Sequence, residues 1–195
     1  VAAGSDQIGF WIALPQHPTG QFEGTQISAN TWPRRMRIRE FSGNTAHSNF
    51  DGVMFDRGPR PDGTFNIGGA GHMSRADPGN EASEPVPSVI DNLSGEEAVY
   101  QLGIWSRGEY HLYTNLKLAD NAIGFTHASG APGVAPYTSR VENSLFVGES
   151  ANIGNPTRPE EVAYGRSLPA ESADFPIRGY EYYDYLHQVV NTRFV

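Results

Sequence analysis

One recurring run most constrains how this chain can fold: an apolar stretch, then small or acidic residues, then a polar residue and a glycine. The run occurs four times, and its closing glycines are Gly9, Gly52, Gly124 and Gly154. The four copies are loosely alike and irregularly spaced, which is the pattern of a solenoid interrupted by loop insertions. We therefore expect an all-β fold, a parallel β-helix built of short strands and turns.

Helical periodicity is scarce elsewhere in the chain. A helical turn or two is expected within 95–105 and one turn within 158–165. In the segment RRMRIREF (34–41), Met36 and Ile38 alternate with arginines, the period of two expected of a strand. Further short β-rich runs lie at 108–121, 143–148 and 187–195. The 22 Gly and 14 Pro also fit short strands joined by turns, and a β-sandwich is the alternative fold.

Asparagine has a specific use in the turns of a β-helix. Its amide can bond its neighbours in adjacent coils, and its backbone tolerates left-handed geometry. We interpret Asn44 and Asn121 as such ladder residues. Residues 56–88 and 155–176 are rich in Gly, Pro and polar residues and are expected to be long insertions. The whole of 1–195 is then one β-helix domain.

Charge and cysteine content exclude some classes of protein. The formal net charge of −8 argues against a nucleic-acid partner, because phosphate binding needs a basic surface. The absence of cysteine excludes disulfides and cysteine-bound zinc. No apolar run approaches the roughly 18 residues that span a bilayer. Both ends of the sequence look cut inside structured segments, so we expect a fragment of a longer protein.

Four stretches of the chain resemble a known family. They are IGFWIALPQHPTG (8–20), FSGNTAHSNFDG (41–52), SLFVGESANIG (144–154) and IRGYEYYDYLHQVVNTRFV (177–195). In this order they are similar to the right-handed β-helix region of the cell-migration-inducing hyaluronidase family. Transmembrane hyaluronidases and fibrocystin-like proteins share that region. The Ala-His-Ser turn at 46–48 is the most specific of the matches.

The resemblance implies a right-handed β-helix and an extracellular polysaccharide context. Two departures limit what it implies about catalysis. The glycine-rich N-terminal domain of the family has no counterpart here, and YYDYLH (182–187) stands where the family has Tyr-Asp-Gly-Pro. The reaction centre of the family is therefore not placed in this stretch.

The candidate catalytic residues are His47, Asp51, Glu181 and Asp184. A histidine can act as general acid–base or bind a metal, and the alternative for His47 is a turn histidine bonded to backbone groups of adjacent coils. Two carboxylates roughly 5–10 Å apart would suit glycoside hydrolysis, and three or more with backbone oxygens would suit Ca²⁺. Cleavage of a glycan by elimination would instead need a cation beside the carboxylate of a uronate sugar. The alternative for each acidic residue is a solvent-exposed side chain in a turn, with no catalytic role.

The candidate substrate-binding residues are basic and aromatic. Arg35, Arg37 and Arg39 form a basic stripe that can hold the carboxylates of an anionic glycan, or that can be a solvated strand face. Tyr182 and Tyr183 lie on opposite faces of one strand, so at least one ring is expected to point outward, where it can stack on a sugar.

Two functions from different classes follow. The first is an extracellular or cell-surface module that binds an anionic polysaccharide such as hyaluronan and cleaves it by hydrolysis or elimination. The second is a non-catalytic structural or adhesion β-helix of a cell-surface protein. In both, the exposed strand edges at the ends of a solenoid predict contact with the rest of the parent protein or with another subunit.

Overall fold

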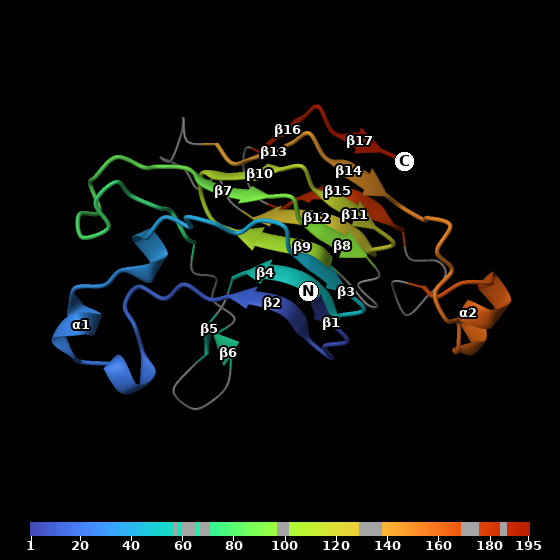
Figure 1. Cartoon of the computed structure of the whole chain (residues 1–195), viewed down its shortest axis with the longest axis horizontal. Helices are drawn as coiled ribbons and strands as arrows, with labels where there is room; N and C mark the ends of the chain where they lie inside the picture. Colours follow the sequence, from blue (N-terminus) through green and yellow to red (C-terminus); the bar gives the residue numbers. More distant parts are fainter. Residues whose placement is uncertain are drawn as a thin grey trace.

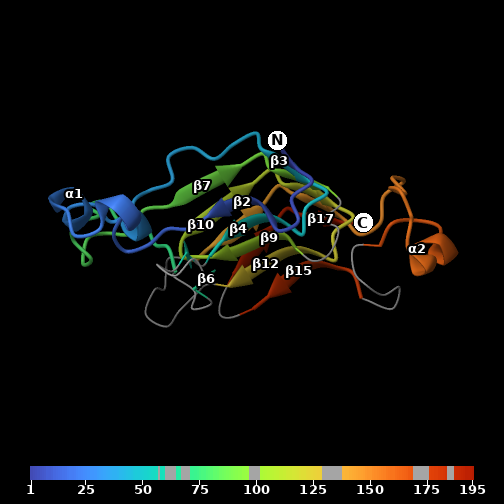
Figure 2. The same cartoon turned by 90° about the horizontal axis from the view of Figure 1, so that it is seen from below.

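The centre of the molecule is a series of coils whose strands form parallel β-sheets around one core. The computed structural model describes residues 1–56, 58–59, 65–66, 71–96, 102–128, 138–168, 176–183 and 187–195. A segment containing the short helix α1 (Gln26–Ala29) projects on one side of the stack, and helix α2 (Pro159–Tyr164) projects on the opposite side (Figures 1 and 2).

Three parallel sheets contain most of the strands. Sheet A has the order β1 (Ala2–Ala3), β3 (Thr45–His47), β8 (Ser94–Glu96), β11 (Lys117–Ala119), β14 (Leu145–Val147) and β17 (Arg193–Phe194). Sheet B has the order β2 (Ile8–Ile12), β4 (Asp51–Phe55), β9 (Leu102–Arg107), β12 (Ile123–Ala128) and β15 (Arg178–Tyr182). Sheet C has the order β7 (Ser88–Asp91), β10 (His111–Thr114), β13 (Arg140–Glu142) and β16 (Gln188–Val190). The remaining elements are the 3₁₀ turns η1 (Gly20–Phe22) and η2 (Pro33–Arg35) and the antiparallel pair β5 (Gly58–Pro59) and β6 (Phe65–Asn66).

The chain visits the sheets in a repeated order. From β7 onward it runs through sheet C, then A, then B, and each strand pairs in parallel with its equivalent one coil away. In the coil before β7, Ser42 bridges Asp91 in place of a full sheet C strand. This order is consistent with the expected β-helix. It does not fit the alternative sandwich, whose sheets are antiparallel.

The turn from sheet C to sheet A is the same in every coil. Each turn has one residue with left-handed backbone, and these residues are Gly43 and Asn92, Asn115, Asn143 and Asn191, with φ between 46° and 66°. The backbone N–H of Asn115 donates to Glu142 O in the next coil, and that of Asn143 donates to Val190 O. Side chains add to this ladder, since Asn191 Nδ2 donates to Asn143 Oδ1 at 2.7 Å.

A second ladder lies at the turn from sheet A to sheet B. Asn121 Nδ2 donates to Gly95 O in the preceding coil at 3.3 Å, which confirms the ladder role predicted for Asn121. Asn49 is fully buried and makes the equivalent bond to Ala2 O at 3.1 Å. Asn44 is not a ladder residue, because its amide donates to Ser42 O within its own turn. The left-handed position is occupied by Gly43, one residue earlier.

A column of glycines runs across sheet B. By strand register it contains Gly9, Gly52, Gly103, Gly124 and Gly179. A Cβ on Gly52 would lie 2.5 Å from Gly103 O, and one on Gly103 would lie 2.5 Å from Gly124 O. Glycine is required because adjacent coils approach this closely. Three of the four repeat glycines seen in the sequence belong to the column, whereas Gly154 lies outside the strands.

The core fills the space between the three sheets. Its buried members come from all of them: Ala46, Leu118 and Phe146 from sheet A; Val53, Phe55, Ile104 and Phe125 from sheet B; Ile90, Tyr113 and Val141 from sheet C. Aromatic rings stack from coil to coil, as Phe125 does on Tyr180 at 5.4 Å between centroids and 6° between planes. Phe10 packs against this core.

Two local expectations are corrected by the structure. Residues 34–41 form no regular strand: Pro33 begins η2, and Met36 N donates back to Trp32 O, after which Ile38 and Phe41 pack against the core. The described parts of 95–105 lie in strands and contain no helical turn. The turn expected at 158–165 is confirmed as α2. No helix in the described ranges is long and apolar enough to cross a membrane.

The long connections gather on the two sides of sheet B. Residues 13–40 and 56–87 follow sheet B strands, and 148–177 precede β15. By contrast, every described turn from sheet C to sheet A has only two residues between its strands. Insertions are thus kept away from the asparagine ladder, where a longer turn would break the stacking.

We expect the glycine column to be intolerant of any side chain. Gly103→Ala should lower the free energy of unfolding by about 1–3 kcal/mol, because its methyl group would overlap Gly124 O and force two coils apart. Urea denaturation measures this. Gly71→Ala is the control, since a Cβ there meets nothing within 4 Å. Equal losses in the two variants would contradict the role of the column.

The left-handed backbone of Asn115 predicts that two substitutions of this residue differ in stability. Asn115→Gly keeps a backbone suited to φ 56°, whereas Asn115→Ala does not. Both variants lose the bond from Asn115 Nδ2 to Asp91 Oδ1. We expect Asn115→Ala to be less stable than Asn115→Gly by about 1 kcal/mol in thermal unfolding. Equal melting temperatures of the two variants would show that the left-handed backbone at position 115 does not disfavour alanine.

Candidate functional site: a basic pocket beside the coils

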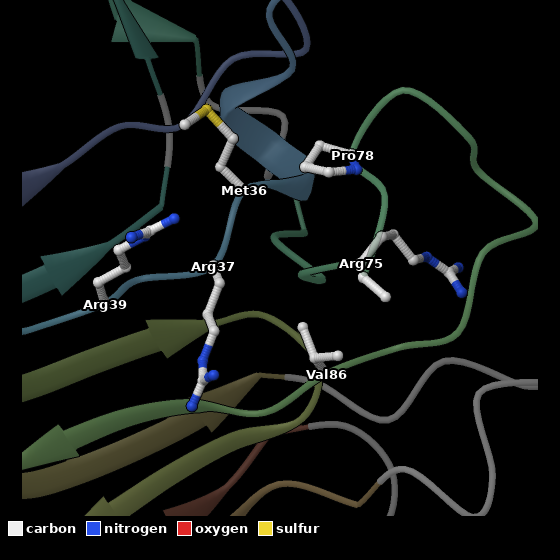
Figure 3. Close-up of a pocket in the computed structure, with 7 residues that line it drawn as sticks. Met36, Arg37, Arg39, Arg75, Pro78 and Val86 are labelled. Carbon is white, nitrogen blue, oxygen red and sulfur yellow. The ribbon is translucent and has the colours of Figure 1, made fainter.

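A pocket of about 500 Å³ lies between two segments that follow sheet B strands. It is lined by Met36, Arg37, Arg39, Arg75, Ala76, Pro78 and Val86. Figure 3 shows Arg39 and Arg75 on opposite sides of the pocket, with Arg37 between them. Among the described residues that line the pocket none is acidic, so the pocket is locally basic on a chain of net charge −8.

Backbone pairing holds the two walls together. Met73 N donates to Arg34 O at 3.1 Å, and Arg75 N donates to Arg35 O at 2.9 Å. The wall that contains Arg37 and Arg39 is also attached to the coils, because Ile38 N donates to Ser88 Oγ at the start of β7. The positions of the arginine backbones are therefore set by the sheet and not by a free loop.

The three arginines predicted as a stripe do not act alike. Arg35 lies in η2, with its guanidinium carbon 5.4 Å from the centroid of the Trp32 ring. Arg37 and Arg39 are exposed on either side of Ile38, and neither forms an ion pair within the described part of the chain. Arg75 completes the pocket, and its Nη1 donates to Ser83 O at 2.9 Å. Sequence spacing offered no signal for Arg75.

The structure places the candidate catalytic residues at separate points. His47 ends β3, with Nδ1 3.3 Å from Ser48 Oγ. Asp51 begins β4 and is buried, and its Oδ1 accepts a bond from Leu102 N in the next coil at 3.2 Å. Glu181 lies in β15 and pairs with Arg178 at 3.1 Å. Asp184 lies outside the described residues.

Asp51 and Glu181 are not brought together by the fold. β9 and β12 lie between their strands in sheet B, and a strand spacing of roughly 4.8 Å puts them about 14 Å apart across the sheet. The carboxylates of glycoside hydrolases are about 5–9.5 Å apart. In the ranges that the structure describes, no group of three or more His, Asp or Glu side chains is placed to hold a metal ion.

Tyr182 and Tyr183 have different surroundings although both are 55% exposed. Tyr182 aligns with His127 in sheet B and stacks on His187 at 5.8 Å, which extends the interior ring stack. Tyr183 lies on the other side, where its ring is 5.3 Å from the Trp105 ring. Of these two tyrosines, Tyr183 is therefore the one that adds to the aromatic surface around Trp105.

Two buried carboxylates, those of Asp56 and Asp120, organise the surface. Asp56 Oδ2 accepts bonds from Trp105 Nε1 at 2.8 Å and from Arg107 Nε at 3.1 Å. Asp120 binds Arg166 at 2.6 Å and so attaches the segment with α2 to a turn between sheets A and B. Their partners are far away along the chain, so no local pattern could have revealed these contacts.

A line of histidines runs through the interior next to the pocket. His72 Nδ1 lies 2.7 Å from His111 Nε2, and His72 Nε2 lies 2.7 Å from Met36 O in the pocket wall. Because the carbonyl of Met36 can only accept, His72 Nε2 carries the proton and Nδ1 accepts from His111. His127 stacks on His187 at 4.2 Å between centroids.

Burial determines the protonation of these histidines. Desolvation lowers the pKa of His72, although its bond to Met36 opposes the shift. The pKa of His111 is lowered well below its ordinary value by burial and then by the charge of His72. Burial, followed by His187 and His111, has the same effect on the pKa of His127. The folded interior therefore favours neutral imidazoles.

Comparisons with known proteins agree with the resemblance drawn from the motifs. Residues 1–54 match the family model described as the CEMIP β-helix. Over 94% of its length the chain is 34% identical to a protein of Dictyostelium discoideum. Over the same share it is 32% identical to the human cell migration-inducing and hyaluronan-binding protein and 34% identical to the human cell surface hyaluronidase CEMIP2. The resemblance is thereby confirmed.

These relatives are much longer than the chain. It spans 18% of the length of the Dictyostelium protein and 14% of each human protein. The similarity therefore concerns one region of each relative.

The buried histidines predict loss of stability in mild acid. An unfolded histidine has a pKa near 6.5, so below that pH the unfolded chain binds more protons than the folded one. The contribution that each buried neutral imidazole makes to the free energy of unfolding is fully present above about pH 6.5. Each buried imidazole should remove up to about 1.4 kcal/mol per pH unit as the pH falls below that value.

Urea denaturation between pH 7.5 and pH 5 tests this prediction. His127→Phe keeps a ring in the stack and removes one titrating group, so its stability should depend less steeply on pH. An unchanged pH dependence in this variant would contradict the assignment to His127.

Proposed function

We propose that this chain is a β-helix module that binds an anionic polysaccharide of the hyaluronan type in the basic pocket. The observation that supports the proposal most directly is that Arg37, Arg39 and Arg75 line one pocket of an otherwise acidic chain. The names of the human relatives, a hyaluronan-binding protein and a hyaluronidase, support the same class of ligand.

The chemistry of the pocket suits a uronate. A guanidinium presents parallel N–H groups that match the two oxygens of a carboxylate. Arg37 and Arg39 lie two residues apart in the segment that follows η2, exposed and without ion pairs in the described structure. Met36, Pro78 and Val86 add apolar surface for the C–H faces of the sugar rings.

The described residues favour binding over cleavage. Asp51 is bonded to the next coil and Glu181 to Arg178, and the two carboxylates lie three strands apart. His47 belongs to sheet A and is not among the residues that line the pocket. Cleavage by these three residues would need a rearrangement of the coils. We therefore assign binding, and no reaction, to this module.

A structural or adhesion module is the second candidate function. It is favoured by the turn ladders, whose polar atoms bond to neighbouring coils and not to a ligand. Such a module would be a rigid spacer. The two candidates differ in whether the isolated chain binds a glycan at all.

Three finer features complete the proposal. We infer that the coil is right-handed, since crossovers between parallel strands of one sheet are right-handed in nearly all cases. We place the module outside the cell or at its surface, as the names of the relatives suggest. Val190 and Phe194 are about half exposed on the edge strands β16 and β17, which supports contact with the rest of the parent protein or another subunit.

Removing the two exposed arginines should weaken glycan binding. We expect the double variant Arg37→Gln, Arg39→Gln to bind a hyaluronan oligosaccharide roughly tenfold or more weakly, because two charge-assisted contacts are lost. The dependence of affinity on salt should also become shallower, since fewer charges are paired. Isothermal titration at two salt concentrations measures both effects.

Arg193→Gln is the matched control. It removes an exposed positive charge from β17 in sheet A, away from the pocket, and should leave the affinity unchanged. Neutral dextran should not bind the wild-type chain. An equal loss in the control and the double variant, or no binding of hyaluronan by the wild-type chain, would overturn the proposed function.

A further inference from the structure

The outer face of sheet B has an ordered column of side chains. Register aligns Trp11, Met54, Trp105, Thr126 and Glu181 across its five strands, and Met54 and Thr126 in this column are buried. The neighbours of Trp105 point inward, since Ile104 belongs to the core and Ser106 bonds the buried Tyr113. Successive side chains of a strand alternate between faces, so Trp105 lies on the outer side.

A single buried residue, Asp56, holds the aromatic part of this face in place. Asp56 is 5% exposed and accepts the indole N–H of Trp105 and the Nε–H of Arg107 on the same oxygen. The indole N–H of Trp11 donates to the backbone oxygen of Asp56 at 2.9 Å. Two indoles and one guanidinium are thus fixed before any ligand arrives, which lowers the entropic cost of binding.

Tyr183 extends this surface into solvent. Its backbone N–H donates to His127 O at 3.1 Å, and its ring lies edge-on to Trp105 at 5.3 Å. The guanidinium carbon of Arg107 is 5.7 Å from the centroids of both rings. The ring of Tyr183 is therefore held by its neighbours and is still 55% exposed, and tyrosine is a residue type enriched at interfaces.

We propose that Tyr183, Trp105 and Arg107 form a stacking subsite for one pyranose ring of a uronate-containing glycan. The C–H face of the sugar lies against the tyrosine ring, and the guanidinium faces the sugar's carboxylate or hydroxyl oxygens. This inference rests on the proposed function, because it assumes the same class of glycan. It names a second contact region for that glycan, formed by residues that do not line the basic pocket.

The two regions should respond differently to salt. The pocket acts through Arg37 and Arg39, so its contribution falls as ions screen the charges. Stacking on Tyr183 depends on contact area, which salt does not screen. Loss of the tyrosine ring should therefore weaken binding by the same factor at low and at high salt.

The test is a titration of hyaluronan oligosaccharides into the wild-type chain and Tyr183→Ala at two salt concentrations. We expect Tyr183→Ala to bind roughly five- to tenfold more weakly at both. Tyr183→Phe should retain most of the affinity, because it keeps the ring. Tyr164→Ala, which removes a half-exposed tyrosine from α2, is the control and should bind like the wild-type chain. Urea denaturation of each variant separates a loss of binding from a loss of folding.

The outcomes separate this inference from the proposed function. If Tyr183→Ala binds as tightly as the wild-type chain while the double arginine variant is weakened, the subsite is wrong and the proposed function stands. If Tyr183→Ala and Tyr164→Ala are weakened equally, the subsite is also wrong. If the wild-type chain does not bind the glycan, both proposals fail.

Discussion

The register between neighbouring coils is the constraint on which the rest of this structure depends. It is set at the turn from sheet C to sheet A, where one residue per coil has left-handed backbone and donates its N–H to the next coil. A longer turn there would displace every following strand. The close approach of the coils at the glycine column is possible only because this register is kept.

Because that turn cannot lengthen, the variable parts of the chain are confined to the two sides of sheet B. The segments 13–40 and 71–87 meet on one side and form the basic pocket. The segment with α2 is held on the other side by the pair of Arg166 and Asp120. The outer face of sheet B lies between these projections (Figures 1 and 2), and both proposed contact regions are built next to it. A rigid coil thus positions residues that its own turns do not supply.

The interior is linked to this surface through a histidine. His72 belongs to the segment 71–87, yet it is buried against His111 of sheet C and holds Met36 O in the pocket wall. An apolar residue at position 72 would leave that carbonyl without this donor. The buried imidazoles therefore have a structural use, and their lowered pKa values are the consequence of burying polar rings in a solenoid.

The sequence was sufficient to predict the general type of fold. The repeated runs ending at Gly9, Gly52 and Gly124 reflect the glycine column, and the ladder role of Asn121 follows from what an asparagine amide can do in a turn. The motifs also identified the related family, because coils of a solenoid retain local signatures. Asn44 was misplaced by one residue, since Asn and Gly are both suited to the left-handed position and both occur there.

The pairing of residues into sites was decided only by the tertiary structure. Arg75 joins Arg37 and Arg39, and Asp56 binds Trp105, across stretches that include whole coils and insertions. In a parallel coil, neighbours in space are one full turn apart in sequence, and each insertion changes that distance by an arbitrary amount. Local patterns of residues therefore report the coil, whereas contacts between coils and insertions appear only when the register is known.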